Sequence, residues 1–181
     1  MAEFEVGRSE GPALTARAWK TSIAVAFLLP LLACSKEPKA PPQKAEPALA
    51  QLSGYNHTGD YIHQYYVDGQ GGGNVRAYGG GGSFVCCISY PAAWREGLTA
   101  KVRWTTSSSD PKATGPAAQE TWHEKVVPID RYREAGTTLN VHFLPAGEVR
   151  LIVTSMTAGW PGYPGPAAPV KPPGYPPWQK Q

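Results

Sequence analysis

The feature that most constrains this chain is an alternation of apolar and polar residues with a period of two. Positions 98, 100, 102 and 104 are apolar, and the positions between them are Thr, Lys and Arg. Residues 139–143 repeat the pattern around Val141. Because successive side chains of a strand point to opposite faces, this alternation predicts strands with one buried face and one polar face.

Further short segments rich in aromatic and β-branched residues predict additional strands at residues 61–67, 74–78, 84–89, 125–127 and 149–153. Glycine-rich turn signals separate them, and we expect hairpin loops at residues 69–73 and 79–82. Residues 91–97 are expected to form a short helix or turn, and residues 107–119 a polar loop. The sequence therefore predicts an all-β domain over residues 53–157, folded as a small antiparallel β-sandwich or open barrel.

Proline is concentrated outside this domain. Residues 34–52 are charged and Pro-rich, and we expect them to be a disordered tether because such a composition cannot form a core. Residues 158–181 repeat Pro, Gly, Tyr and Trp, which predicts a disordered or polyproline-like tail. The formal net charge is only +3, and acidic and basic residues are equal in number between positions 53 and 157. We therefore expect no nucleic-acid partner.

The N-terminal residues are typical of a bacterial secretion signal. Arg17 and Lys20 precede an apolar run at residues 23–33, which is shorter than the roughly 20 residues that span a bilayer. The run ends in Leu-Leu-Ala followed by Cys34, which resembles the lipobox of bacterial lipoproteins. We expect residues 1–33 to be a signal peptide and Cys34 to be lipidated, which anchors the chain on the periplasmic side of the outer membrane. The alternative is a chance cysteine behind an ordinary signal peptide.

Two adjacent cysteines, Cys86 and Cys87, lie inside the predicted domain. Adjacent strand residues point to opposite faces, so we expect one thiol in the core and one exposed. Buried free thiols are one interpretation of the pair. A vicinal disulfide is the second, since the periplasm oxidises thiols. Metal or redox chemistry is the third, but the pair lacks the spacing of a zinc site. We expect no metal.

No catalytic signature stands out in the sequence. The chain contains neither a Gly-x-Ser-x-Gly elbow nor a His-Glu-x-x-His motif, and its glycine runs lack the Gly-Lys-Ser/Thr of a phosphate loop. The four histidines are expected to be polar strand residues that face water. His142, for example, lies on the face of its predicted strand opposite Leu139 and Val141. We therefore expect no enzyme activity and no cofactor.

Aromatic residues and arginines offer a different signal. Trp, Tyr and Arg are enriched among the residues that dominate protein interfaces, and loops on a rigid sheet often carry recognition. Most aromatic residues of the domain are expected in its core, whereas others, together with Arg76, Arg95 and Arg103, are expected to form a binding surface. The candidate partner contacts that we select are Gln70, Arg76, Trp94 and Arg95.

Several motifs of the domain occur in an order that resembles a known family. They include Gly54-Tyr55-Asn56-His57-Thr58, Tyr66-Val67-Asp68-Gly69-Gln70, Val85-Cys86-Cys87-Ile88-Ser89, Val102-Arg103-Trp104 and Val141-His142-Phe143-Leu144-Pro145. Together they resemble an uncharacterised domain family of proteobacterial lipoproteins. The resemblance covers roughly residues 53–154 and leaves the Pro-rich tail outside.

Members of that family are similar to immunity proteins encoded beside phospholipase effectors of type VI secretion. The resemblance implies a membrane-anchored periplasmic lipoprotein that binds and inhibits such a phospholipase. An inhibitor tethered to the membrane under attack has a high local concentration there. The alternative is a structural envelope lipoprotein that docks a partner through residues 158–181. A third hypothesis is a metal or redox protein that uses Cys86 and Cys87.

Overall fold

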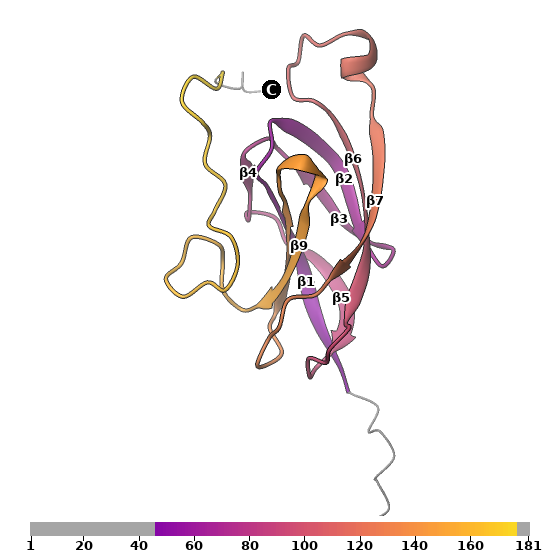
Figure 1. Cartoon of the computed structure of the whole chain (residues 1–181), viewed down its shortest axis with the longest axis vertical. Helices are drawn as coiled ribbons and strands as arrows, with labels where there is room; N and C mark the ends of the chain where they lie inside the picture. The colour runs from indigo at the N-terminus through magenta and orange to yellow at the C-terminus, as the bar shows by residue number, and fades with distance from the viewer. Residues whose placement is uncertain (1–45, 177–181) are drawn as a thin grey trace, which may run out of the picture. The chain divides into compact units, whose positions relative to one another are not determined.

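Two β-sheets pack face to face in the computed structural model, which describes residues 46–176 (Figure 1). The first sheet has the strand order β4-β1-β8-β9, and β5 also pairs with β1; the second has the order β3-β2-β6-β7. The strands are β1 Pro47–Asn56, β2 Asp60–Val67, β3 Gln70–Val75, β4 Gly79–Gly80, β5 Val85–Pro91, β6 Thr99–Ser108, β7 Thr121–Pro128, β8 Thr138–Phe143 and β9 Val149–Thr154. The sheets do not close into a barrel, so the predicted sandwich is confirmed.

Helix is almost absent from the described residues. Two 3-10 turns, η1 Gly115–Ala118 and η2 Pro145–Gly147, lie in the β6–β7 and β8–β9 connections. Of the predicted helix or turn at residues 91–97, Pro91 ends β5 and the remaining residues form turns and no helix; a backbone hydrogen bond of 3.3 Å from Leu98 N to Arg95 O closes one turn. The connections therefore leave nearly all regular backbone pairing to the strands.

One strand pairing departs from the antiparallel expectation. β1 and β8 run parallel, with Gln51 opposite Thr138 and Asn56 opposite Phe143, whereas the other strand pairs are antiparallel. β8 is thus held between β1 and β9, in the interior of the first sheet. A local alternation pattern does not distinguish parallel from antiparallel neighbours, because both present alternate side chains to one face.

The core lies between the two sheets. The predicted inward positions of β6 and β8 are buried, and rings meet across the interface at the centre. Phe143 of β8 contacts the rings of Tyr65 and Trp104, with centroid separations of 5.4 and 5.7 Å. Other fully buried members of this core are Leu52, Val67, Val102, Leu139, Val141 and Leu151. Such aromatic contacts add specific geometry to the hydrophobic burial that holds the sheets together.

The domain begins earlier than the sequence predicts. β1 occupies residues 47–56 and so includes the last residues of the predicted tether, 34–52. Ala50 and Leu52 point into the core and are buried, which explains why these residues are a strand despite Pro47. Pro47 is the first residue of the strand, where the missing N–H costs little. Residues 34–45 of the predicted tether lie outside the described residues.

The glycine run after Asp68 forms a strand and not the predicted loop. Asp68 and Gly69 alone make the turn, both with positive φ, and β3 then pairs with β2. Gly72 lies against the ring of Tyr65, and a Cβ at this position would overlap that ring. The glycines therefore create space for a buried tyrosine. From the sequence alone, they are interpreted as residues of a turn.

The C-terminal tail also differs from the expected disorder. Residues 158–176 have turns but no regular secondary structure, and they run beside the first sheet (yellow in Figure 1). The backbone N–H of Ala158 donates to the Tyr55 hydroxyl at 3.2 Å. Tyr175 packs edge-on against Tyr78, and its hydroxyl lies 2.8 Å from Ser109 Oγ. Aromatic residues within the Pro-rich repeat thus fix this segment on the domain.

The position of Gly72 generates the first prediction. We expect Gly72→Ala to lower the free energy of unfolding by about 3 kcal/mol, because overpacking against a buried ring forces side chains or backbone to shift. Gly82→Ala is the matched control, since a Cβ there meets nothing within 4 Å. Urea unfolding followed by tryptophan fluorescence measures both. Equal stability of the two variants would contradict the placement of Gly72 in a packed strand.

Candidate functional site

Aromatic and basic side chains gather on the outer face of the second sheet. The Arg103 guanidinium of β6 lies 4.9 Å from the ring centroid of Trp122 on β7, within cation–π range. The Tyr66 ring of β2 stacks on the same indole, with a centroid separation of 6.4 Å. Trp122 is 49% exposed, and Val126, on the same face of β7, is 63% exposed. We call Tyr66, Arg103, Trp122 and Val126 the aromatic face.

Ion pairs hold Arg103 in place beside Trp122. Its Nε lies 3.1 Å from Glu124 Oε2, and Lys101 Nζ lies 3.6 Å from Glu124 Oε1. These side chains are about half exposed, so the pairs add little stability. Their effect is to orient the guanidinium, which leaves the indole and guanidinium pre-positioned for a partner. The aromatic face therefore has the residue types and the rigidity of an interface anchor.

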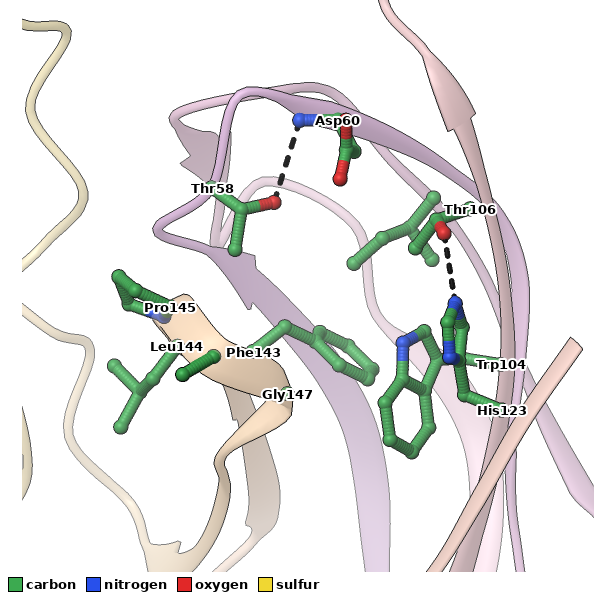
Figure 2. Close-up of a pocket in the computed structure, with 11 residues that line it drawn as sticks. Thr58, Asp60, Trp104, Thr106, His123, Phe143, Leu144, Pro145 and Gly147 are labelled. Atoms are coloured by element: carbon green, nitrogen blue, oxygen red, sulfur yellow. Dashed lines mark hydrogen bonds between the residues drawn. The ribbon is translucent and has the colours of Figure 1, made fainter. Parts of the chain in front are cut away.

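A small cavity of about 200 Å³ lies at one end of the sandwich (Figure 2). Trp104 and Phe143 form its apolar wall, and η2 closes one side. The remaining lining residues are Thr58, Asp60, Ile62, Thr106, His123, Leu144, Pro145, Ala146 and Gly147. The cavity is smaller than the roughly 300–1,000 Å³ of typical ligand pockets. It has room for a small group and not for a nucleotide or lipid.

Polar groups in the cavity largely satisfy one another. Thr106 Oγ1 lies 2.8 Å from His123 Nε2, and the His123 ring stacks on Trp104 with centroids 5.1 Å apart. The Asp60 N–H donates to Thr58 Oγ1 at 3.4 Å, as Figure 2 shows. Within residues 46–176, no three metal-ligating side chains lie close enough to hold an ion. The geometry therefore favours a structural role for this cavity, at the end of the core, over a role in ligand binding.

The outer face of the first sheet is covered by the C-terminal tail, and this corrects the expectation that His142 faces water. His142 does point away from the core, as predicted, but it is fully buried. Its Nδ1 lies 2.9 Å from His57 Nε2, and its Nε2 lies 2.6 Å from the hydroxyl of Tyr163. The Tyr55 ring stacks on the imidazole at 4.6 Å. A polar residue on a strand was therefore buried by a segment that the sequence places outside the domain.

Burial controls the ionisation of this cluster. It lowers the pKa of His142 to about 3, and the charges of His57 and Arg150 act in the same direction. Burial also lowers the pKa of His57 and raises the pKa of Tyr163. Both imidazoles are therefore neutral at pH 7. The cluster is a neutral hydrogen-bonded network that fixes the tail on the sheet.

The four residues selected from the sequence as partner contacts do not form one surface. Trp94 donates its indole N–H to Ile129 O at 3.0 Å and packs against the core, so it is only partly available. Arg95 beside it is exposed. Arg76 is exposed in the β3–β4 connection, and Gln70 donates to Cys86 O at 3.4 Å. The structure thus distributes these residues over three segments of the chain.

Cys86 and Cys87 are joined in a vicinal disulfide within β5. Cys86 is exposed and Cys87 is half-buried, so the alternative of two buried free thiols does not describe them. The oxidised pair has no thiolate to offer a metal. Of the three interpretations of this pair, the structure supports the disulfide.

The predicted lipidation site Cys34 and the predicted signal peptide, residues 1–33, lie outside the described residues. Within residues 46–176, no helix is long and apolar enough to cross a membrane. The lipid anchor and the periplasmic location therefore stay predictions.

The geometry defines a class of protein: a two-sheet β domain with one outer face covered by its own tail and the other open. A family match lies within this domain. Residues 55–151 match the model of DUF3304, described as a protein of unknown function, and the chain belongs to this family. No curated protein and no solved structure matches the chain. The expected membership in an uncharacterised family is confirmed, and the family description assigns no function.

Sequence reasoning missed the role of Trp122 as the centre of an exposed cluster. Trp122 and Arg103 belong to the aromatic and arginine residues that the sequence marks as a group, but nothing local ranks them above Trp94 or Arg95. Their contact depends on the register of β6 with β7, which places Thr105 opposite Trp122 and Arg103 opposite Glu124. The alternation of β7 was the available signal, because it puts Trp122, Glu124 and Val126 on one face.

The contact between the tail and His142 generates a second prediction. We expect Tyr163→Phe to lower the free energy of unfolding by about 1–2 kcal/mol, because it leaves a buried imidazole nitrogen without its partner. Trp160→Ala, in the same segment but 66% exposed, is the matched control and should change stability by less than about 0.5 kcal/mol. Chemical denaturation measures both. The reverse order of effects would show that the tail is not fixed through Tyr163.

The lowered pKa of His142 generates a third prediction. Below about pH 6.5 the unfolded chain binds a proton at this histidine, whereas the folded chain excludes it down to about pH 3. Stability should therefore fall as the pH drops through this window, by up to about 1.4 kcal/mol per pH unit from this group. Above pH 7.5 His142 is neutral in both the folded and the unfolded chain, so it adds no pH dependence to the free energy of unfolding. Urea midpoints at pH 4–8 measure the slope, and His142→Gln should flatten it. An unchanged slope in that variant would contradict the assignment.

Proposed function

We propose that this protein is a binding module that inhibits a phospholipase effector of type VI secretion by occupying its surface. The observation that carries the proposal is the aromatic face, an exposed Trp–Arg–Tyr stack on a rigid sheet. Trp, Tyr and Arg supply most of the binding energy in protein interfaces, and they do so when held in place before binding. The identity of the partner rests on the resemblance of the sequence to immunity proteins.

The charge pattern of the aromatic face favours a protein partner over a nucleic acid or a bare membrane. Arg103 and Lys101 are both paired with Glu124, so the face carries little net charge. A surface that binds phosphates needs unpaired basic groups. An apolar centre with a balanced charged rim is instead the usual composition of a protein interface.

A lipid anchor at Cys34 adds to this proposal. A phospholipase that works from the periplasm acts at the membrane surface, and a tethered inhibitor is concentrated at the same surface. The affinity needed for protection is then lower than for a freely diffusing inhibitor. The proposal therefore combines a docking face on the β domain with a membrane address at the N-terminus.

The alternative of an envelope lipoprotein that docks through its tail has less support. The aromatic residues expected to form a sticky surface are used within the chain: Tyr163 binds His142, and Tyr175 packs on Tyr78. Among the described tail residues, Trp160 and Val170 are the large apolar side chains that stay exposed. A partner that binds residues 158–176 therefore has Trp160 as its exposed aromatic contact, or it displaces contacts that hold the tail on the sheet.

A mutational binding experiment tests the proposal. The purified full-length chain in mild detergent is mixed with type VI phospholipases of the same bacterium, and hydrolysis of phospholipid in mixed micelles is followed. We expect stoichiometric inhibition by the wild-type chain. Trp122→Ala and Arg103→Ala should each weaken binding by at least tenfold, the typical cost of truncating an interface anchor. Trp160→Ala is the matched control and should inhibit like the wild type.

Other outcomes separate the hypotheses. Full phospholipase activity with the protein in excess overturns the inhibitor proposal. Inhibition that is lost in Trp160→Ala and kept in Trp122→Ala places the interface on the tail and overturns the assignment of the aromatic face.

A further inference from the structure

A serine, a histidine and a glutamate form a connected line on the outer face of the second sheet. Ser107 Oγ lies 2.7 Å from His63 Nε2, and His63 Nδ1 lies 3.4 Å from Glu120 Oε1. Ser107 belongs to β6, His63 to β2, and Glu120 immediately precedes β7. The three residues are far apart in the sequence, and the pairing of three neighbouring strands brings them together. This order of hydroxyl, imidazole and carboxylate is the arrangement that activates serine nucleophiles.

The contacts of His63 favour the proton arrangement that a nucleophilic serine requires. A carboxylate beside Nδ1 favours a proton on that nitrogen, which leaves Nε2 to accept the hydroxyl proton of Ser107. The hydroxyl also lies 3.3 Å from the carbonyl of Ser108, but the contact with Nε2 is much shorter. The ring of Tyr61 packs edge-on against the imidazole at 4.7 Å and restricts its orientation.

His63 lies next to an irregularity in the pairing of its strand. The pairing of β2 with β6 shifts register between Ile62 and Tyr65, so His63 lies at a bulge. Bulges re-aim side chains and are common next to functional sites. In the regular part of the ladder, Ser107 is opposite Tyr61 and not opposite His63. His63 is therefore a diagonal neighbour of Ser107 on the same face, at the residue where the ladder becomes irregular.

The imidazole and the carboxylate are partly open to solvent, whereas the serine is not. The side chains of His63 and Glu120 are 32% and 43% exposed, and Ser107 is buried, with 9% of its surface exposed. The inner face of the same strands provides a comparison, because Thr106 and His123 also form a hydroxyl–imidazole contact of 2.8 Å. Among the described residues, His123 has no carboxylate at ion-pair distance, whereas His63 has Glu120. Of these two pairs, only Ser107 and His63 on the outer face have a carboxylate beside the imidazole.

We propose that Ser107, His63 and Glu120 form a nucleophilic serine site that reacts with carboxylic esters. Ser107 Oγ attacks the ester carbonyl and its proton passes to His63 Nε2; the bond to the leaving alkoxide breaks, and His63 returns the proton to the departing alcohol. The product is an acyl ester of Ser107. Water then attacks this ester with His63 as the base, releases the carboxylic acid and restores the serine hydroxyl. Glu120 stabilises the charged imidazole in both steps.

The site lies on an open sheet face, which does not exclude water as a closed pocket does. We therefore expect slow turnover, so covalent labelling is a better measurement than hydrolysis. A fluorophosphonate tests the same chemistry: the Ser107 oxygen forms a bond to phosphorus, fluoride leaves, and the proton passes to His63. This activity is independent of the proposed inhibition, because the assay contains no phospholipase.

The experiment treats the full-length chain with a fluorophosphonate and measures the mass of the intact protein and of its peptides. We expect one adduct, on Ser107, that is lost in Ser107→Ala. Labelling should slow by at least tenfold in His63→Gln and Glu120→Gln. Thr106→Ala, which removes the hydroxyl of the inner pair, is the matched control and should label at the wild-type rate. Circular dichroism confirms that each variant is folded, and Glu120→Gln, at an exposed position, keeps the test decisive if Ser107→Ala does not fold.

Three outcomes overturn the proposal. They are an unlabelled wild-type chain, an adduct on another residue, and labelling of Ser107 that is unchanged in both His63→Gln and Glu120→Gln. The last result would show that Ser107 reacts without activation by His63 and Glu120. None of these outcomes bears on the inhibition assay, so the failure of one proposal can be told from the failure of the other.

Discussion

Strand β8 is buried along its whole length, and the covering of both its faces determines much of the remaining structure. On one face Leu139, Val141 and Phe143 meet the second sheet. On the other face Asn140 and His142 are covered by residues that follow β9. A strand with polar residues on one side is normally left facing water, so the polar side requires a hydrogen-bonding cover. The hydroxyl of Tyr163 supplies it for His142.

This one-sided covering divides the surface of the molecule. The tail occupies the outer face of the first sheet, and the outer face of the second sheet keeps the exposed Trp122 with its arginine and tyrosine neighbours. The serine–histidine–glutamate line lies on that same open face. The two proposals thus concern neighbouring parts of one surface, and both depend on cross-strand neighbours of β6. A partner seated on Trp122 and an ester at Ser107 use different side chains of the same three strands.

The parts of the fold that follow from local patterns could be predicted, and the parts that depend on distant neighbours could not. The alternation of β6 correctly identifies Ala100, Val102 and Trp104 as inward residues, because a period of two is a property of the strand itself. The role of Gly72 depends on the Tyr65 ring across the ladder, and the burial of His142 depends on a tyrosine in a Pro-rich segment. The serine–histidine–glutamate line depends on the register of β2, β6 and β7, for which the local sequence carries no signal.

The parallel pairing of β1 with β8 has a consequence for how the chain acquires its structure. Gln51 pairs with Thr138, so the first strand finds this neighbour only after most of the domain has been made. Contacts between residues so far apart carry a large loop-closure entropy, and proteins rich in them fold slowly. Until then β1 exposes Leu52 and one unpaired edge. During that interval the free edge of β1 can pair with a strand of another chain, so the domain is most open to aggregation before β8 is in place.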